Sequence, residues 1–210
     1  MKQLIILSIA IIFLSSCQPE DNEQYLHFNN EDYGFIPQEY EEIGKNFIFK
    51  NAQNEEVIIQ SQYYILTKKY ESGNGFGQPN QTESYYYDDL RIELKLMNVE
   101  IPDEQYCDIV NIHISNTFYK DLYVEVTIPY YDGQFCKPNG FKQFQPYTEL
   151  TQMVINGKTY FNVKTVVPND FFTLYNGSQI DKLYYDMDHG IIGFDDTQNN
   201  KEFRLVNNQP

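Results

Sequence analysis

Positive charge is scarce in this chain. Its 15 lysines and arginines stand against 30 aspartates and glutamates, which gives a formal net charge of −15. Binding of a polyanion relies on clustered lysine and arginine, so this balance excludes nucleic acid as a partner. The acidic balance also disfavours docking onto anionic lipid headgroups.

Recognisable catalytic and zinc-binding patterns are missing. No Gly-x-Ser-x-Gly occurs, so nothing indicates the strand-to-helix turn that presents a serine nucleophile. His27, His113 and His189 are scattered and form no His-Glu-x-x-His pattern, which disfavours zinc. His113 lies between Ile112 and Ile114 and is expected on the wet face of a strand. Enzymatic activity is therefore unsupported, although not excluded, and no cofactor is predicted.

Tryptophan is absent, whereas tyrosine occurs 19 times. The tyrosines cluster at Tyr63-Tyr64, Tyr85-Tyr86-Tyr87, Tyr130-Tyr131 and Tyr184-Tyr185. Consecutive tyrosines in a strand face opposite ways, so each pair would place one ring in a core and one outward. Outward rings could stack on sugars or form a protein-binding surface, although tyrosine is also a favoured strand residue.

The most apolar stretch of the chain is short. The run from Leu4 to Leu14 follows the cationic start Met1-Lys2 and contains 11 residues. As a helix it would be about 16 Å long, roughly half of a ~30 Å hydrocarbon core. A charged start, a short apolar stretch and small residues before a cut are typical of a secretory signal.

The end of this run, Leu14-Ser15-Ser16-Cys17, resembles the lipobox of bacterial lipoproteins. The resemblance implies that residues 1–16 are removed and that Cys17 becomes the first mature residue, carrying a covalent lipid. Burial of acyl chains contributes roughly 0.8 kcal/mol per CH₂, and two or more chains give stable attachment. The alternatives are cleavage by the ordinary signal peptidase and an uncleaved anchor.

The residues after Cys17 refine the predicted location. Gln18 stands where an aspartate would retain an enteric lipoprotein in the inner membrane, so the resemblance points to the outer membrane. Glu20, Asp21 and Glu23 resemble the acidic export signal of some Bacteroidota surface lipoproteins, and they equally suit a solvated tether. Residues 17–24 are predicted to be a lipidated, flexible tether and 25–210 a single domain, on the periplasmic face of the outer membrane or on the cell surface.

Two further cysteines remain, Cys107 and Cys136. In an oxidising compartment they are a candidate disulfide, and closing about 29 residues would stabilise the fold by roughly 3–4 kcal/mol. If the strands on either side of Phe118 form a hairpin, only a chain reversal near Gly133 brings Cys136 back toward Cys107. Two separate buried thiols are the alternative.

Period-two alternation dominates the rest of the chain. Leu90, Ile92, Leu94 and Leu96 alternate with charged residues, and Leu122, Val124, Val126 and Ile128 show the same pattern. Strands are predicted at 46–50, 56–70, 85–97, 108–115, 122–128, 151–155, 158–167, 180–185, 190–194 and 201–206. The Asn156-Gly157 pair predicts a two-residue hairpin turn.

Only Ile36–Ile43 is predicted to be helical, with Pro37 near its first turn and Gly44 after its end. Loops are expected at Ser72–Ser84 and at Asp132–Tyr147, where the phenylalanines either tuck under the loop or form a contact patch. The predicted fold class is all-β and mainly antiparallel, a barrel-like or two-sheet sandwich domain with one short helix.

One weak metal hint is present. The alternating carboxylates Asp186 and Asp188, before His189-Gly190, suggest a calcium loop, but the glycine comes one residue early and no acid closes the loop at Thr197. The alternative is a tight turn in which Gly190 supplies an unusual backbone angle.

The carboxy-terminal quarter, from Ile155-Asn156-Gly157-Lys158 through Leu183-Tyr184-Tyr185 and Gly190-Ile191-Ile192-Gly193-Phe194 to Phe203-Arg204-Leu205, resembles the closing strands of uncharacterised Bacteroidota lipoproteins. The resemblance supports the β fold and implies no active site.

Two functional hypotheses follow. The first is a lipid-anchored envelope lipoprotein whose non-catalytic β domain serves as a binding or structural module, held to the membrane by its lipid and contacting a protein, glycan or small ligand. The second is a lipid-anchored hydrolase acting on polysaccharide or envelope material. A cleft with two carboxylates, or a histidine beside a serine or cysteine, would favour the second.

Overall fold

The computed structural model describes residues 24–71, 84–97, 108–116, 121–131, 136–168, 180–197 and 199–206, with the backbone alone at 130–131 and 136–139. Within these ranges the fold is all-β and mainly antiparallel, as predicted. The strands are β1 (Gln24–Leu26), β2 (Asn46–Lys50), β3 (Glu56–Glu71), β4 (Tyr85–Leu96), β5 (Ile109–Asn116), β6 (Leu122–Tyr131), β7 (Cys136–Gly140), β8 (Thr151–Ile155), β9 (Lys158–Val166), β10 (Lys182–Asp186), β11 (Gly190–Asp196) and β12 (Lys201–Leu205).

All the strands belong to one sheet in the order β7-β6-β5-β4-β3-β2-β12-β11-β10-β9-β8, and β1 pairs in parallel with β4. Most neighbours in the sheet follow each other in the chain. The exception is β2 beside β12, which joins the first half of the chain to its end. In the described part of the chain, β7 and β8 do not pair, so the sheet is open.

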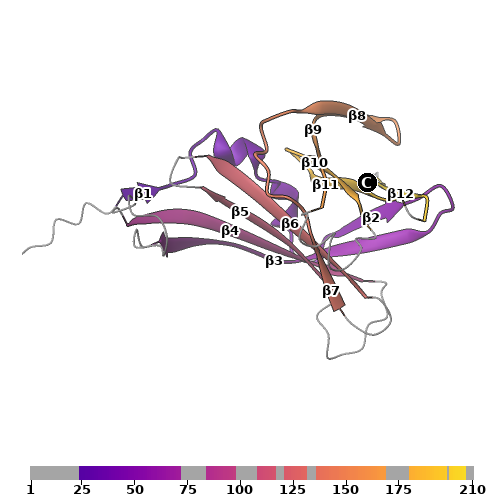
Figure 1. The fold of residues 1–210 in the computed structure, drawn as a ribbon, viewed down its shortest axis with the longest axis horizontal. Helices are drawn as coiled ribbons and strands as arrows, with labels where there is room; N and C mark the ends of the chain where they lie inside the picture. Colours follow the sequence, from indigo (N-terminus) through magenta and orange to yellow (C-terminus); the bar gives the residue numbers. More distant parts are fainter. Residues whose placement is uncertain are drawn as a thin grey trace, which may run out of the picture.

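The sheet curls so that its two ends share one core. Phe144, which follows β7, packs on Tyr185 of β10 with ring centroids 5.4 Å apart, and Phe141 bridges to Pro168 beyond β9. Asn156, at the tip of the β8–β9 hairpin, donates from Nδ2 to the carbonyl of Leu205 in β12 at 3.0 Å. Figure 1 shows this hairpin arching over β10, β11 and β12. The result is a sandwich-like domain built from a single sheet.

The predicted alternation is confirmed in β4 and β6, which place their apolar residues in the core. The side chains at 90, 92, 94 and 96 of β4 and at 122, 124, 126 and 128 of β6 are all buried. Burying one face of each strand removes apolar surface from water and sets the register of the ladder.

The predicted helix at Ile36–Ile43 is wrong. The chain forms two short 3-10 turns instead, η1 (Asp32–Phe35) and η2 (Gln38–Tyr40). Ile36 is extended, with φ −104° and ψ 114°, because the ring of a following proline disfavours the helical region. Pro37 therefore separates the two turns.

The long loop predicted at Asp132–Tyr147 is wrong in part, because Cys136–Gly140 form β7 and pair with β6. Pro138 lies opposite Pro129 of β6, and Pro138 is tolerated because β7 is an edge strand. Phe141 and Phe144 are buried, as the tucked alternative predicted. The strand β1 was also missed, since its residues were assigned to the tether and the domain's first residues.

A bulge in β3 was not predicted. The β3–β4 register shifts between Ser61 and Tyr63, so Gln62 is an extra residue. Ile59 and Ser61 face inward before the bulge, and Tyr64 lies opposite the buried Ile92 after it. The bulge therefore exchanges which residues of β3 face the core.

Candidate functional site

The connection between β10 and β11 is a tight turn stabilised by a buried carboxylate. Asp186 Oδ1 accepts hydrogen bonds from the backbone N–H groups of Asp188 at 3.1 Å and His189 at 3.2 Å. Gly190 has φ +73°, which an L side chain rarely adopts. The turn predicted for Asp186–Gly190 is thus confirmed.

This turn orients the ring of His189. Nδ1 lies 2.7 Å from Asp186 Oδ1, and Nε2 lies 2.7 Å from Lys158 Nζ. An ammonium group has donors only, so Nε2 must accept from Lys158, and we assign the ring proton to Nδ1, which donates it to Asp186. The edge of the ring also packs on Tyr160, with centroids 5.2 Å apart. His189 is therefore held from three sides.

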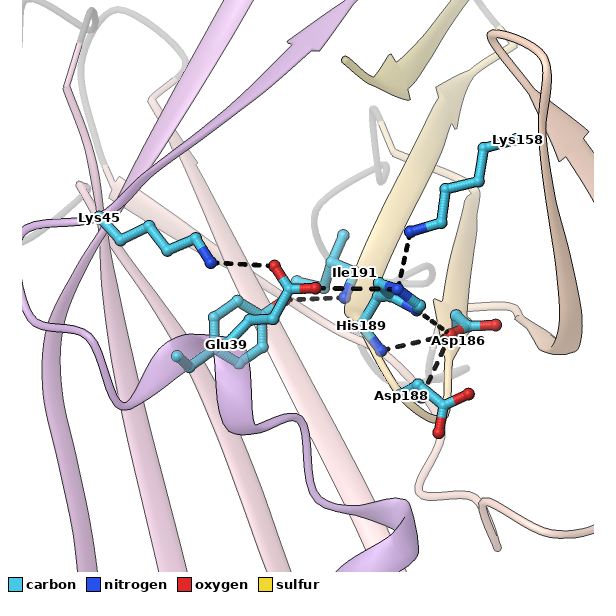
Figure 2. A network of polar contacts seen from close by, with 8 residues as sticks. Glu39, Lys45, Lys158, Asp186, Asp188, His189 and Ile191 are labelled. Atoms are coloured by element: carbon cyan, nitrogen blue, oxygen red, sulfur yellow. Dashed lines mark hydrogen bonds and ion pairs between the residues drawn. The ribbon is translucent and has the colours of Figure 1, made fainter. Parts of the chain in front are cut away.

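A third element reaches the same place from far away in the sequence (Figure 2). Tyr40 of η2 is buried, and its hydroxyl accepts the backbone N–H of Ile191 at 2.8 Å. Burial raises the pKa of Tyr40 well above its usual range, so this hydroxyl stays protonated. The anchored turn brings Glu39 beside His189, with Oε1 3.8 Å from Nε2, and Lys45 pairs with Glu39 at 3.1 Å.

These side chains surround a cavity of about 220 Å³, which we call the His189 cavity. Its polar lining consists of Glu39, Lys45, Asn46, Lys158 and His189. Two lysines thus face one glutamate, and Glu39 is already paired with Lys45. Among the described residues, no carboxylate lies within 4.0 Å of Lys158 Nζ, whose ammonium rests over the ring of Tyr160 at 4.7 Å. The side chains that line the cavity therefore carry a net positive charge, although the protein as a whole is acidic.

The calcium hypothesis stays a prediction. Asp186, Asp188 and His189 offer ligand atoms within 4.8 Å of one another, and they are the one such group in the part of the chain that the structure describes. However, Asp186 Oδ1 already accepts two backbone N–H groups and His189 Nδ1, and His189 Nε2 faces an ammonium group. The geometry gives Asp186 a turn-forming role instead.

A second histidine–aspartate pair lies on the outer face of the sheet. His113 of β5 hydrogen-bonds through Nε2 to Asp89 of β4, whose Oδ2 also accepts from Arg91 Nε at 3.1 Å. Burial alone would raise the pKa of Asp89, but the hydrogen bonds and charges of His113 and Arg91 outweigh it and hold the pKa below its ordinary 3.8. His113 is on the wet face, as predicted, whereas its partner was missed. The sequence signal that could have identified this partner is the pair of adjacent acids, Asp88 and Asp89, before the apolar alternation of the same strand.

No hydroxyl or thiol side chain hydrogen-bonds a histidine ring within the described ranges. Instead, His189 Nε2 accepts from Lys158, and Asp89, the partner of His113, also accepts from Arg91. The constellation expected for a hydrolase with a serine or cysteine nucleophile is therefore not formed by these residues.

Several tyrosines lie close together where β1 and the end of β3 pair with the start of β4. Lys68 Nζ lies 4.4 Å from the ring centroid of Tyr25 and 3.9 Å from that of Tyr86, and Tyr70 packs on Tyr86 at 5.0 Å. Burial and a hydrogen bond to Asp88 raise the pKa of Tyr25 to about 12. The rings are thus occupied by a lysine of the same chain. The opposite facing expected of consecutive tyrosines is clear at Tyr184-Tyr185, where only Tyr185 is buried.

The cysteines are only partly covered by the described residues. Cys17 and Cys107 lie outside them, and Cys136 begins β7 opposite Tyr131, with only its backbone described. The chain reversal required for a bridge is present, because β6 and β7 are antiparallel neighbours. The lipid attachment and the Cys107–Cys136 disulfide stay predictions.

No helix in the described ranges is long and apolar enough to cross a membrane. Comparison with known proteins found no matching family model, curated protein or solved structure. Any function of the candidate site must therefore be inferred from the geometry of the site alone.

The sequence reasoning did not single out the His189 cavity. Glu39 lies in η2, Lys45 directly before β2 and Lys158 at the start of β9, and no spacing in the chain relates them to His189. The Asp-x-Asp-His-Gly motif drew attention to the turn, but it gave no sign of the lysines that face it.

Proposed function

We propose that this chain is a lipid-anchored protein of the bacterial cell envelope whose β domain binds a small anionic ligand in the His189 cavity without catalysis. The single observation that carries the proposal is the ammonium group of Lys158. It donates to a neutral ring nitrogen of His189 and has no carboxylate partner among the described residues. A carboxylate or phosphate oxygen would add a second, opposite charge to this contact, which makes the bond stronger than the present one from the ammonium group to a neutral nitrogen.

The surroundings support an anion more than a cation. Lys45 lies at the same cavity and adds a second ammonium group. A net charge of −15 disfavours attraction of anions at long range, but a local positive site still binds them because screening limits the range of surface charge. The ligand is therefore expected to be small and held by direct contacts.

The proposed lipid anchor would place this binding site at a membrane. The lipobox ending at Cys17 and the acidic residues that follow support attachment to the outer membrane, on its periplasmic face or on the cell surface. The polypeptide would stay in water while acyl chains on Cys17 hold it to the bilayer. The proposed role is capture of an anionic solute or polymer end at the envelope.

Isothermal titration of the full chain, solubilised in non-ionic detergent, with inorganic phosphate, sulfate and acetate tests the binding. We expect saturable binding of at least one anion and a loss of about tenfold or more in affinity for Lys158→Met, which corresponds to about 1.4 kcal/mol. Lys182→Met is the matched control, because Lys182 is exposed on β10 and outside the cavity. Absence of saturable binding, or an equal loss in both variants, would refute the anion site.

A hydrolase is the second candidate, and one observation favours it. An aspartate that orients a histidine whose Nε2 faces a cavity is the arrangement of a general base. Turnover of p-nitrophenyl acetate or p-nitrophenyl glycosides by the unaltered chain, abolished in His189→Gln, would establish this function in place of non-catalytic binding. The same rates with and without the protein would remove it for these substrates.

A further inference from the structure

A second cavity, of about 570 Å³, lies where the tips of three hairpins meet. They are the β2–β3 turn at 51–55, the β8–β9 turn at 156–157 and the β11–β12 turn at 199–200. We call it the hairpin-tip cavity. Its volume lies within the usual range of small-molecule sites, roughly 300–1,000 Å³, although its lining is polar.

Unpaired side-chain amides characterise this lining. The amides of Gln53, Asn54 and Asn200 have no hydrogen-bond partner among the described residues. Asn156 uses Nδ2 to bind the carbonyl of Leu205, which leaves its Oδ1 without a donor. Each free amide offers two N–H donors and a carbonyl acceptor.

The charged residues of the lining, in contrast, are paired. Lys50 Nζ lies 2.7 Å from Glu56 Oε1, and Arg204 contacts Asp195 at 2.6 Å and Glu202 at 3.1 Å. Those pairs leave no free cation for an anion and no free carboxylate for an ammonium group. The groups that remain available are neutral and can both donate and accept.

Local turn geometry explains only part of this arrangement. Asn54, Asn156 and Asn200 have φ of 62°, 49° and 53°, a region that asparagine tolerates better than most residues. That preference accounts for an asparagine at each tip taken alone. It accounts neither for Gln53 nor for the convergence of three tips, which requires the β8–β9 hairpin to fold back onto β12.

We infer that the hairpin-tip cavity binds a neutral polyhydroxylated ligand, a saccharide unit. A hydroxyl group donates one hydrogen bond and accepts others, so neighbouring hydroxyls of a sugar complement amides that do both. The described lining contains no aromatic ring for stacking, so recognition relies on hydrogen bonds exchanged with water. Such bonds contribute little net free energy each, and the dissociation constant is expected to be on the order of millimolar.

The test is an NMR titration of the ¹⁵N-labelled full chain in detergent with D-glucose, D-mannose and N-acetyl-D-glucosamine. Saturable shifts of the amide signals at 53–54, 156–157 and 199–200 are expected with at least one sugar. The double variant Asn54→Gly/Asn200→Gly should weaken that binding about tenfold or more. Glycine adopts positive φ without strain, so these substitutions remove the amides and keep the turns.

The matched control is Glu149→Gly, because Glu149 also has positive φ, 53°, and lies outside the cavity. Gln53→Ala, at a residue without positive φ, provides a second weakening variant if the double variant folds poorly. Lys158→Met should leave sugar binding intact, which separates this inference from the anion site. No saturable shifts with any of the three sugars, or shifts that persist in the amide variants, would overturn it.

Discussion

Gly190 lies in the β10–β11 turn directly against the ring of Tyr40, with no room for a Cβ atom. We expect Gly190→Ala to lower the free energy of unfolding by about 3 kcal/mol or more, because a Cβ would overlap the tyrosine ring and its hydroxyl at a positive φ. Urea denaturation measures the change.

Gly157→Ala is the control for that substitution. Gly157 also has positive φ, +81°, but its Cβ would meet nothing within 4 Å. Backbone strain alone should then cost about 1–2 kcal/mol. Equal losses in the two variants would show that the contact with Tyr40 does not matter.

Asp89 links stability to acid pH. Its pKa in the folded protein is lowered, so the unfolded chain takes up a proton first as the pH falls below the ordinary value of 3.8. The free energy of unfolding should therefore be retained above that pH and decrease below it. Asp89→Asn should cost about 2 kcal/mol at pH 7 and flatten this acid limb, as followed by urea unfolding between pH 2.5 and 7.

Glu55→Gln serves as the comparison for Asp89. Hydrogen bonds from Lys201 and Asn51 lower the pKa of Glu55 too, but its carboxylate is exposed. Exposed pairs contribute little, so this variant should keep the acid limb of the unaltered chain. If Asp89→Asn left the loss of stability in acid unchanged, Asp89 would not be the group that links stability to acid pH.

At the scale of elements, the bulge at Gln62 is one extra residue between two stretches of β3. Deleting Gln62 would leave Ser61 opposite Leu94 and Tyr63 opposite Glu93 as consecutive pairs, so Tyr64 would still face the core and the free energy of unfolding should fall by less than about 1 kcal/mol. Thermal or urea unfolding measures this.

Gln62→Ala separates the residue count from the side chain. The side chain of Gln62 makes one exposed hydrogen bond, to Gln60 at 2.7 Å, so its loss should change stability by less than about 0.5 kcal/mol. A loss of more than about 3 kcal/mol on deletion of Gln62, beside a harmless Gln62→Ala, would show that the fold requires the extra residue itself.

How far the sequence predicts an element depends on how much of its pattern is local. Strands β2 and β8 have the predicted bounds, since alternation and the Asn156-Gly157 turn act between near neighbours in the chain. Strand β7 was not predicted, because Pro138 and Gly140 are typical of loops. Only the pairing with β6 makes this segment a strand. The helix prediction failed at Ile36, where the preference of a residue before proline outweighed the start and stop signals at Pro37 and Gly44.

At the scale of the whole molecule, the lipid anchor makes a direct prediction. Cells expressing the chain and grown with labelled palmitate should incorporate label into it, and Cys17→Ala should abolish incorporation. Cys136→Ala is the control and should leave labelling unchanged. Equal labelling of the Cys17→Ala variant and the unaltered chain would rule out attachment at Cys17.

The sequence by itself determined the period-two strands and the turns that join neighbours, because these depend on local backbone preferences and short motifs. The lipid attachment at Cys17 stays a prediction. Only the tertiary structure decided the His189 cavity and the hairpin-tip cavity. Glu39, Lys45, Lys158 and His189 meet because Tyr40 fixes η2 to β11, and the amide-bearing turns meet because the open sheet curls back on itself. Such contacts follow from the packing of one shared core, and no spacing along the chain encodes them.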